Sequence, residues 1–310
     1  MIPMFAIGAF LIVLPAFGGE YYGHIFILIF LNVALATSYR LFYITGLASF
    51  CHVTFYELGA YTSALLTTKM GLPIGASILV AGLFPAGLAA LVGWPMIRAR
   101  GVYFFLTSFA FFVAVGTVLK QWQGVTGGTQ GIHNIPPIMG FTTVTPYYYI
   151  ALAFMAVTIF VMYRMDHSRF GAELLAIGDS EALAEVTGIN INRHRVLAFS
   201  IGALFAGFAG SIYAHYIRFV HPNAFTMWFS LYILIWCVMG GPRKFWGPIA
   251  GAVLMTSIAE GLRMSGVLQA IFYSIALLIT IMTMPNGIAG LVDSLRVRSE
   301  RRKAGINGTS

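Results

Sequence analysis

Charged side chains are scarce in this chain. Asp, Glu, Lys and Arg make up 9% of its 310 residues, against roughly 25% in an ordinary soluble domain. Hydrophobic residues make up 59%, which is more apolar surface than a soluble core of this length can bury. The alternating pattern of a membrane β-barrel is also absent. The composition therefore excludes a soluble protein and predicts an all-α polytopic membrane protein.

The chemistry-bearing patterns of enzymes are missing as well. The two cysteines, Cys51 and Cys237, lie in apolar runs and indicate no disulfide. The histidines lack metal-ligand spacing, and no GxSxG nucleophile motif is present. None of the four lysines sits in a P-loop. We therefore predict no metal site, no catalytic residue and no cofactor on this chain. Its basic residues are scattered over loops, which argues against a nucleic-acid partner.

Long apolar runs are what the chain has in abundance. A membrane helix needs about 20 apolar residues, and we predict roughly 8–10 such helices. The candidate spans are 4–17, 23–44, 46–68, 74–97, 101–119, 147–163, 196–217, 226–241, 248–262 and 266–284. They predict one transmembrane domain over residues 1–290, followed by a basic cytoplasmic tail over 291–310.

Lys and Arg are distributed unevenly between the predicted loops. With ten spans and the N-terminus inside, 14 of the 18 basic residues face the cytoplasm and four, namely Lys69, Lys120, Arg218 and Arg263, face outward. Because positive charge is retained on the cytoplasmic side, this asymmetry predicts that both termini are cytoplasmic.

One predicted cytoplasmic loop, residues 164–195, contains nine of the charged residues. Within it, Asp179 or Ser180 is a suitable cap for a helix that ends at Gly188. Ala182, Leu183 and Val186 would share an apolar face, opposite Glu181 and Glu185. A helix of about two turns is unstable alone in water and needs a docking surface. That surface is either the rest of this protein or a partner, such as an ATPase encoded by another polypeptide.

Two ionisable residues fall inside the predicted span 46–68. Glu57 is our leading candidate for a translocation pathway, because an acid at membrane depth is costly and usually faces a cavity or a partner. The alternatives for Glu57 are a position near the membrane interface and a packing role. His52 is a weaker pathway candidate, because a single histidine more often joins two helices by a hydrogen bond.

Small residues recur at intervals of four in the span 196–217. Gly202, Ala206 and Gly210 lie on one row, with Gly207 on the adjacent row. Small-xxx-small spacing lets helix backbones approach closely. We therefore predict that these residues pack against neighbouring helices.

Six stretches, taken in order, resemble the LivM-type permeases of branched-chain amino acid ABC importers. They are HVTFYELGAYTSALL, RARGVYFFLTSFAF, VTGGTQGI, RFGAELLAIGDSEALAEVTGIN, RVLAFSIGALFAGFAGSIYAHYIRFVHPNAF and MGGPRKFWGPIAGAV. Together they extend the resemblance over roughly residues 30–290. Glu57 departs from the family, which commonly has a small residue at that position.

The resemblance implies a multi-pass permease of the bacterial inner membrane, surrounded by lipid. It implies a LivH-like second permease subunit, two ATP-binding subunits that use ATP and Mg²⁺, and a periplasmic or lipid-tethered substrate-binding protein. The segment Asp179–Gly188 corresponds to the coupling loop, so coupling to the ATPase is expected from Asp179, Glu181, Ala182, Glu185 and Gly188. The expected solutes are branched-chain or related amino acids. Urea, short amides or aromatic compounds are alternatives, and a stand-alone ion-coupled carrier or channel is a third reading.

Overall fold

The computed structural model describes residues 19–99, 101–261, 271, 273–275 and 278, and the described part is helical. The long helices are α2 (Glu20–Tyr43), α3 (Cys51–Thr68), α4 (Ile74–Met96), α5 (Val102–Gln121), α7 (Val144–Asp166), α10 (Ile191–Ile217), α11 (Met227–Gly240) and α12 (Gly247–Gly261). Short elements join them: α6 (Gln123–Thr126), η2 (Gly128–Gln130), η3 (Ile138–Gly140), α8 (Arg169–Asp179), α9 (Glu181–Val186) and η4 (Pro222–Ala224).

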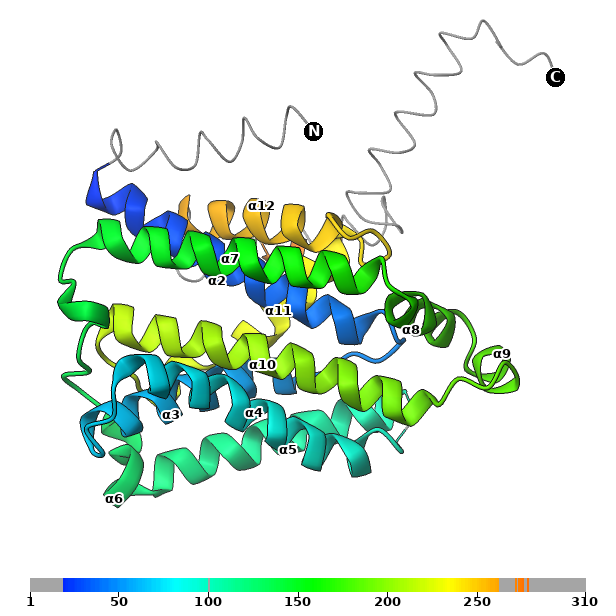
Figure 1. The fold of residues 1–310 in the computed structure, drawn as a ribbon, viewed down its shortest axis with the longest axis horizontal. Coiled ribbons are helices and arrows are strands. Elements are labelled where there is room, and N and C mark those ends of the chain that lie inside the picture. Colours follow the sequence, from blue (N-terminus) through cyan, green and yellow to red (C-terminus); the bar gives the residue numbers. More distant parts are fainter. Residues whose placement is uncertain (1–18, 100, 262–270, 272, 276–277, 279–310) are drawn as a thin grey trace, which may run out of the picture.

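The long helices run roughly along one axis and form a layered bundle (Figure 1). Helix α10 lies in its middle, packed against α3 and α4 on one side and against α2 on the other. Helices α7 and α12 cover α2, and α11 packs on α12 and α2. Helices α8 and α9 lie at one end of the bundle, and α6 lies at the opposite end (Figure 1).

Small residues on α10 make this central position possible. A Cβ on Gly210 would meet the carbonyl oxygen of Tyr56 on α3, and one on Gly207 would meet the backbone of α4. Gly202 faces the backbone of α2, and Ala206 is fully buried. The small residues predicted to pack therefore lie against three different helices, because small side chains along α10 let the backbones of its neighbours approach at different heights.

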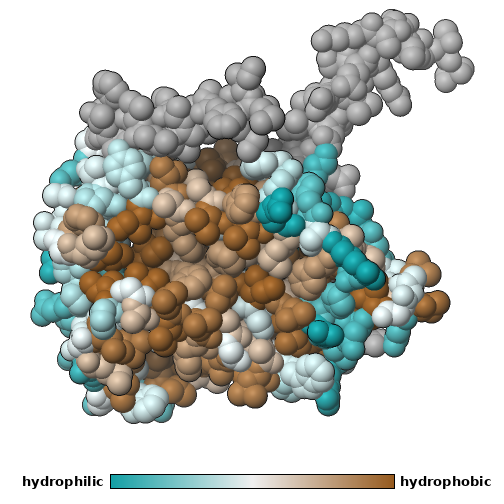
Figure 2. Space-filling view, viewed as in Figure 1, coloured by the Kyte–Doolittle hydropathy of each residue, from teal (hydrophilic) through white to brown (hydrophobic). Residues whose placement is uncertain are grey.

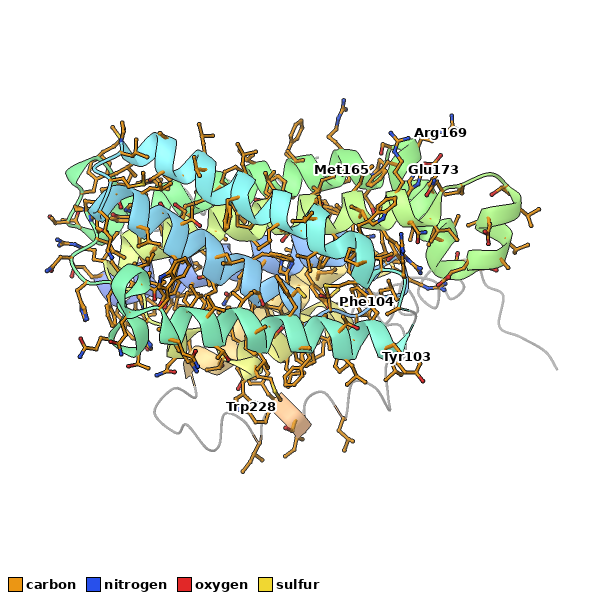
Figure 3. All side chains as sticks on the ribbon, turned by 90° about the horizontal axis from the view of Figure 1, so that it is seen from below. Tyr103, Phe104, Met165, Arg169, Glu173 and Trp228 are labelled. Carbon is orange, nitrogen blue, oxygen red and sulfur yellow. The ribbon has the colours of Figure 1, made fainter. Side chains whose placement is uncertain are left out.

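The surface is that of a membrane protein. Among the described residues, six segments are long and apolar enough to cross a membrane, namely α2, α4, α5, α7, α10 and Pro222–Gly240. Apolar residues cover the middle of the bundle in Figure 2, and hydrophilic residues gather at the end that carries α8. Helix α5 is especially exposed: its Tyr103 faces outward, whereas Phe104 is buried, and both are labelled in Figure 3.

Each predicted span from 23–44 to 248–262 corresponds to a described helix. The spans 4–17 and almost all of 266–284 lie outside the described residues, as does the predicted tail 291–310. Two predicted starts differ from the structure by five residues: helix α3 begins at Cys51, not at Gly46, and α10 begins at Ile191, not at residue 196. Gly46 instead has a positive φ of 85° in the turn that leaves α2. We call residues 44–50 the α2–α3 turn.

Candidate functional site

The charged segment after α7 folds into two short helices. Helix α8 is capped by the Ser168 side chain, and α9 is capped by Ser180, whose hydroxyl accepts the backbone N–H of Leu183 at 3.3 Å. Asp179 was the other candidate for this cap, but it is the last residue of α8. Gly188 follows α9 with a positive φ of 84°, the conformation that commonly ends a helix at glycine. The predicted loop is therefore mostly helical, with the short helix where it was expected.

Helix α9 turns its apolar face away from the protein. Leu183 is 69% exposed and Val186 is 86% exposed, and Ala182 is exposed beside them. Only Ala184 of this helix is buried. Figure 2 shows apolar atoms at the tip of the molecule where Figure 1 places α9. Of the two docking surfaces considered for the helix, its own protein is therefore not the one that covers Leu183 and Val186.

The opposite face of α9 is held by an ion pair. Arg195, at the start of α10, donates from Nη2 to Glu181 Oε1 at 2.7 Å and to the carbonyl oxygen of Thr45 at 2.8 Å. The Arg195 side chain is almost fully buried, whereas Glu181 is one third exposed. Glu181 thus attaches α9 to α10 and to the α2–α3 turn, while Glu185 stays exposed.

Helix α8 packs on the same turn. A Cβ on Gly178 would meet the carbonyl oxygen of Ile44, so the two backbones touch at this position. The α2–α3 turn continues directly into α3. Two backbone N–H groups of the turn are bonded to neighbouring helices: that of Ser49 donates to the Tyr39 hydroxyl of α2, and that of Phe50 donates to the Ser108 hydroxyl of α5 at 3.0 Å. A displacement of α8 and α9 would therefore act first on the α2–α3 turn and the start of α3.

A second set of contacts joins the ends of α2, α7 and the turn after α11. Arg40 Nη1 donates to Asp166 Oδ1 at 2.6 Å, and Arg40 Nε donates to the carbonyl oxygen of Pro242 at 2.7 Å. Both charged side chains are largely buried. At the surface, Arg243 bonds Asp179 at 2.9 Å. The pair of Arg243 and Asp179 joins the end of α8 to the turn after α11.

Glu173 on α8 bonds two basic side chains. Its carboxylate accepts from Arg169 at 3.0 Å and from His194 at 2.7 Å. Arg169 and Glu173 stand close together in Figure 3. Desolvation opposes the ionised form, but the hydrogen bonds from Arg169 and His194 outweigh it and lower the pKa of Glu173. This pair links α8 to the start of α10.

A charged cavity of about 440 Å³ lies beneath α9. It is lined by Glu181, Glu185 and Arg195, by Arg98 at the end of α4, and by residues 189–192. Because its walls come from α4, α9 and α10, the cavity leaves α9 room to move against the bundle.

The two predicted pathway residues differ in their surroundings. His52 is buried and its Nε2 bonds the Ser38 hydroxyl on α2 at 3.0 Å, beside Gly202 of α10. This arrangement favours the packing alternative for His52. Glu57 is 1% exposed, and neither of its carboxylate oxygens has a hydrogen-bond partner in the described part of the chain. The missing partners leave the packing role of Glu57 without support among the described residues.

The sequence did not point to Arg195 or Gly178 as important residues. Arg195 looked like one more basic loop residue, and Gly178 had no distinguishing pattern. The detectable signal was weak, namely an arginine directly before an apolar run that begins at Val196. Within the described residues, no group of three His, Cys, Asp or Glu side chains is placed to hold a metal ion.

Comparison with known proteins decides the family. Residues 21–284 match the family described as the permease component of the branched-chain amino acid transport system. The chain belongs to this family. This permease-family chain is 30% identical over 247 residues to the high-affinity branched-chain amino acid transport system permease protein LivM of Escherichia coli, which covers 71% of the chain and 58% of LivM. The chain therefore spans somewhat less than two thirds of the LivM length.

Two further relatives are more distant. The permease-family chain is 27% identical to LivH of Escherichia coli over 284 residues, or 83% of the chain and 90% of LivH. It is 26% identical to the ribose import permease protein RbsC of Escherichia coli over 227 residues, or 68% of each chain. No solved structure matches the chain significantly.

Proposed function

We propose that this chain is a transmembrane permease subunit of an ATP-driven ABC importer for branched-chain or related amino acids. The observation that carries the proposal is the exposed apolar face of α9, formed by Ala182, Leu183 and Val186. Exposed apolar residues in the hydrophilic end of a membrane protein mark a docking surface for another protein. The family relationship to LivM and LivH supports the type of importer.

In the orientation that we propose, α8 and α9 face the cytoplasm. The supporting observation is that Arg40, Arg98, Arg164, Arg195 and Arg243 belong to that end of the molecule, where positive charge is expected. Both termini are then cytoplasmic and α6 faces the periplasm. The proposed assembly adds a LivH-like permease, two ATP-binding subunits that use ATP and Mg²⁺, and a substrate-binding protein.

The proposed mechanism follows the contacts of α9. An ATPase subunit covers Leu183 and Val186, and its closure on ATP displaces α8 and α9. Arg195 and the Gly178 contact pass the displacement to the α2–α3 turn. The turn then shifts the start of α3, which is a rigid helix in contact with α10, α4 and α5. Alternating access results from two packed arrangements of these helices.

The experiment uses the complete transporter, purified through a tag on this chain and reconstituted in liposomes. In the double variant Leu183→Glu/Val186→Glu, we expect uptake of leucine to fall at least about tenfold, because two buried charges would oppose docking. The ATPase subunits should also co-purify in smaller amounts. Ligand-binding tests on the associated binding protein with leucine, isoleucine, valine, phenylalanine, urea and short amides identify the solute.

Ala172→Glu is the matched control, because it adds an acid at an exposed small residue of α8, outside the apolar face of α9 and outside the charged cavity. It should leave both assembly and uptake near the wild-type level. Wild-type assembly and uptake in the double variant would contradict the docking role of α9. Solute transport by the purified chain without ATP or partners would instead identify a stand-alone carrier or channel.

A further inference from the structure

Helix α3 carries a row of buried polar groups that bond to nothing described. The Thr54 hydroxyl, both carboxylate oxygens of Glu57 and the Tyr61 hydroxyl lack hydrogen-bond partners, although all three side chains are buried. Spacings of three and four residues place them on one face of the helix. We call Thr54, Glu57 and Tyr61 the α3 row. Each unmet polar group at membrane depth is costly, so the row needs a ligand.

Two other polar residues of α3, Ser63 and Thr67, do have hydrogen-bond partners, unlike the α3 row. Ser63 bonds His215 Nε2 at 2.8 Å and accepts the Ser211 hydroxyl at 2.7 Å. Thr67 bonds the carbonyl oxygen of Ser63, four residues earlier, at 2.8 Å. These hydrogen bonds connect α3 to α10 and to its own backbone, so the hydroxyls of Ser63 and Thr67 have partners.

Thr54 is unpartnered for a specific reason. A threonine in a helix usually bonds the carbonyl oxygen four residues earlier, which for Thr54 is that of Phe50. The Ser230 hydroxyl of α11 already donates to that oxygen at 2.8 Å. The Thr54 hydroxyl is therefore free to bond a ligand on the face that Glu57 occupies.

The three side chains lean in one direction. Side chains of a helix lean toward its N-terminus, so Tyr61 leans toward the Glu57 side of the row and Glu57 toward the Thr54 side. Lys120, exposed near the end of α5, makes no hydrogen bond to Glu57. The Glu57 carboxyl group therefore has no bonded cation in the described part of the chain.

One member of the row meets a cavity. Tyr61 lines a largely apolar cavity of about 660 Å³ between α3, α4 and α5, which extends to Lys69 and Trp122 at the α6 end. Thr54 and Glu57 are not among its lining residues. Toward α8, the Phe50 ring packs on Phe105 and Phe109, with ring centroids 4.6 and 5.4 Å away. In the orientation proposed above, the cavity lies on the outer side of the row and the Phe50 cluster on the cytoplasmic side.

The geometry points to the α3 row as the binding site for the ammonium group of the transported solute, with Tyr61 as the residue where the row meets the apolar cavity. An ammonium group has three donors and no acceptor, and the row offers a carboxylate flanked by two hydroxyl oxygens. A solute that carries a carboxylate or phosphate but no ammonium group would have no group to donate hydrogen bonds to Glu57. This inference rests on the proposed transport function and names the part of the solute that the permease itself recognises.

Chemical protection of Glu57 tests the site without requiring transport. Dicyclohexylcarbodiimide modifies carboxyl groups in apolar surroundings, and mass spectrometry locates the product in the complete transporter. We expect Glu57 to be modified, and leucine and methylammonium to reduce the modification about tenfold. Leucine without its ammonium group, 4-methylpentanoate, should give no protection.

Two outcomes of this experiment would overturn the assignment. Absence of modification in the ligand-free transporter would mean that the carboxyl is already paired. Equal protection by Na⁺ at the same concentration would identify a metal-ion site that does not select ammonium.

Transport provides the second test. The substitution Glu57→Gln keeps the shape and removes the charge, and it should lower the maximal rate of leucine uptake about tenfold or more. Tyr61→Phe, which removes one hydroxyl, should have a smaller effect of the same sign. Glu20→Gln, at an exposed acid on α2, is the control and should transport normally.

The failures of the two hypotheses are distinguishable. If wild-type transporter shows no ATP-dependent uptake, the proposed function fails. If it takes up leucine and Glu57→Gln does so at the same rate, the ammonium site alone is refuted. If Glu57→Gln does not assemble, Tyr61→Phe and the protection experiment on the wild-type transporter still decide the question.

Discussion

Arg195 and Glu181 form an ion pair of 2.7 Å between the start of α10 and α9. Arg195 is buried and also holds the Thr45 carbonyl oxygen, so the pair is where α9 meets the core of the bundle. The face of α9 that carries Glu181 is attached to this protein, and the face that carries Leu183 and Val186 is exposed. Helix α9 is therefore held in position by this protein and exposes its apolar face to a second protein.

The attachment of α9 can be tested on its two glutamates. Glu181→Gln should weaken the pair with Arg195 by about 1 kcal/mol, because Glu181 is partly exposed. Hydrogen exchange of the α9 amides should then be roughly fivefold faster. Glu185→Gln is the matched control, since Glu185 is exposed and should leave the exchange unchanged. Equal rates in the two variants would show that the pair does not hold α9.

The close approach of α10 to α3 predicts a sharp difference between glycines. A methyl group at Gly210 would collide with the backbone carbonyl of Tyr56, so Gly210→Ala should destabilise the protein by about 2 kcal/mol or more. Gly87 on α4 has open space where its Cβ would lie, so Gly87→Ala should be neutral or stabilising by about 0.5–1 kcal/mol. Thermal unfolding in detergent measures both. A stable Gly210→Ala protein would contradict the packing.

The buried pair of Arg40 and Asp166 should be costly to break from one side. Asp166→Asn leaves the guanidinium without its anion, and we expect a loss of about 2 kcal/mol or more. The double variant Arg40→Met/Asp166→Leu should be more stable than Asp166→Asn, because no buried charge remains. The lost stability should not return fully, since Arg40 also bonds the Pro242 carbonyl oxygen. A double-mutant cycle on thermal stability checks this, and strict additivity would argue against a direct pair.

The stability of α8 should depend on pH through Glu173. The pKa of Glu173 lies below its ordinary value of 4.5, so the unfolded chain takes up a proton before the folded one does. The contribution of Glu173 is therefore complete above about pH 5 and declines as pH falls from about 4.5 through the lower folded pKa. Glu173→Gln should lack this decline. Unfolding temperatures measured between pH 3 and 7 should show the two proteins converging at the acidic end, and a constant difference would refute the linkage.

Much of the fold was predictable because membrane helices are encoded locally. Each stays helical because lipid offers no hydrogen bonds to its backbone, so apolar length alone located α2, α4, α5, α7 and α10. The start of α3 was harder to place, since Leu47 and Phe50 continue the apolar run across the turn. The backbone N–H of Phe50 donates to Ser108, and its carbonyl oxygen accepts from Ser230. An apolar run does not reveal such distant hydrogen-bond partners.

The candidate site divides in the same way. Ser180 and Gly188 mark the ends of α9 in the sequence, because capping is a local property. The sequence also predicted the apolar face of α9, but it did not show whether that face is exposed. Glu181 and Glu185 look equivalent at a spacing of four, yet only Glu181 reaches Arg195.

The sequence by itself determined that this protein is a helical membrane protein, where most of its helices lie, and which loops carry its charge. Composition and periodicity suffice for these properties because they depend on residues close together in the chain. Only the tertiary structure decided that Glu181 is paired, that Glu57 is buried without a partner, and that Leu183 and Val186 are uncovered. Pairing and exposure depend on which distant segments meet, and the small residues of α10 control that meeting by setting how closely α2, α3 and α4 can pack around it.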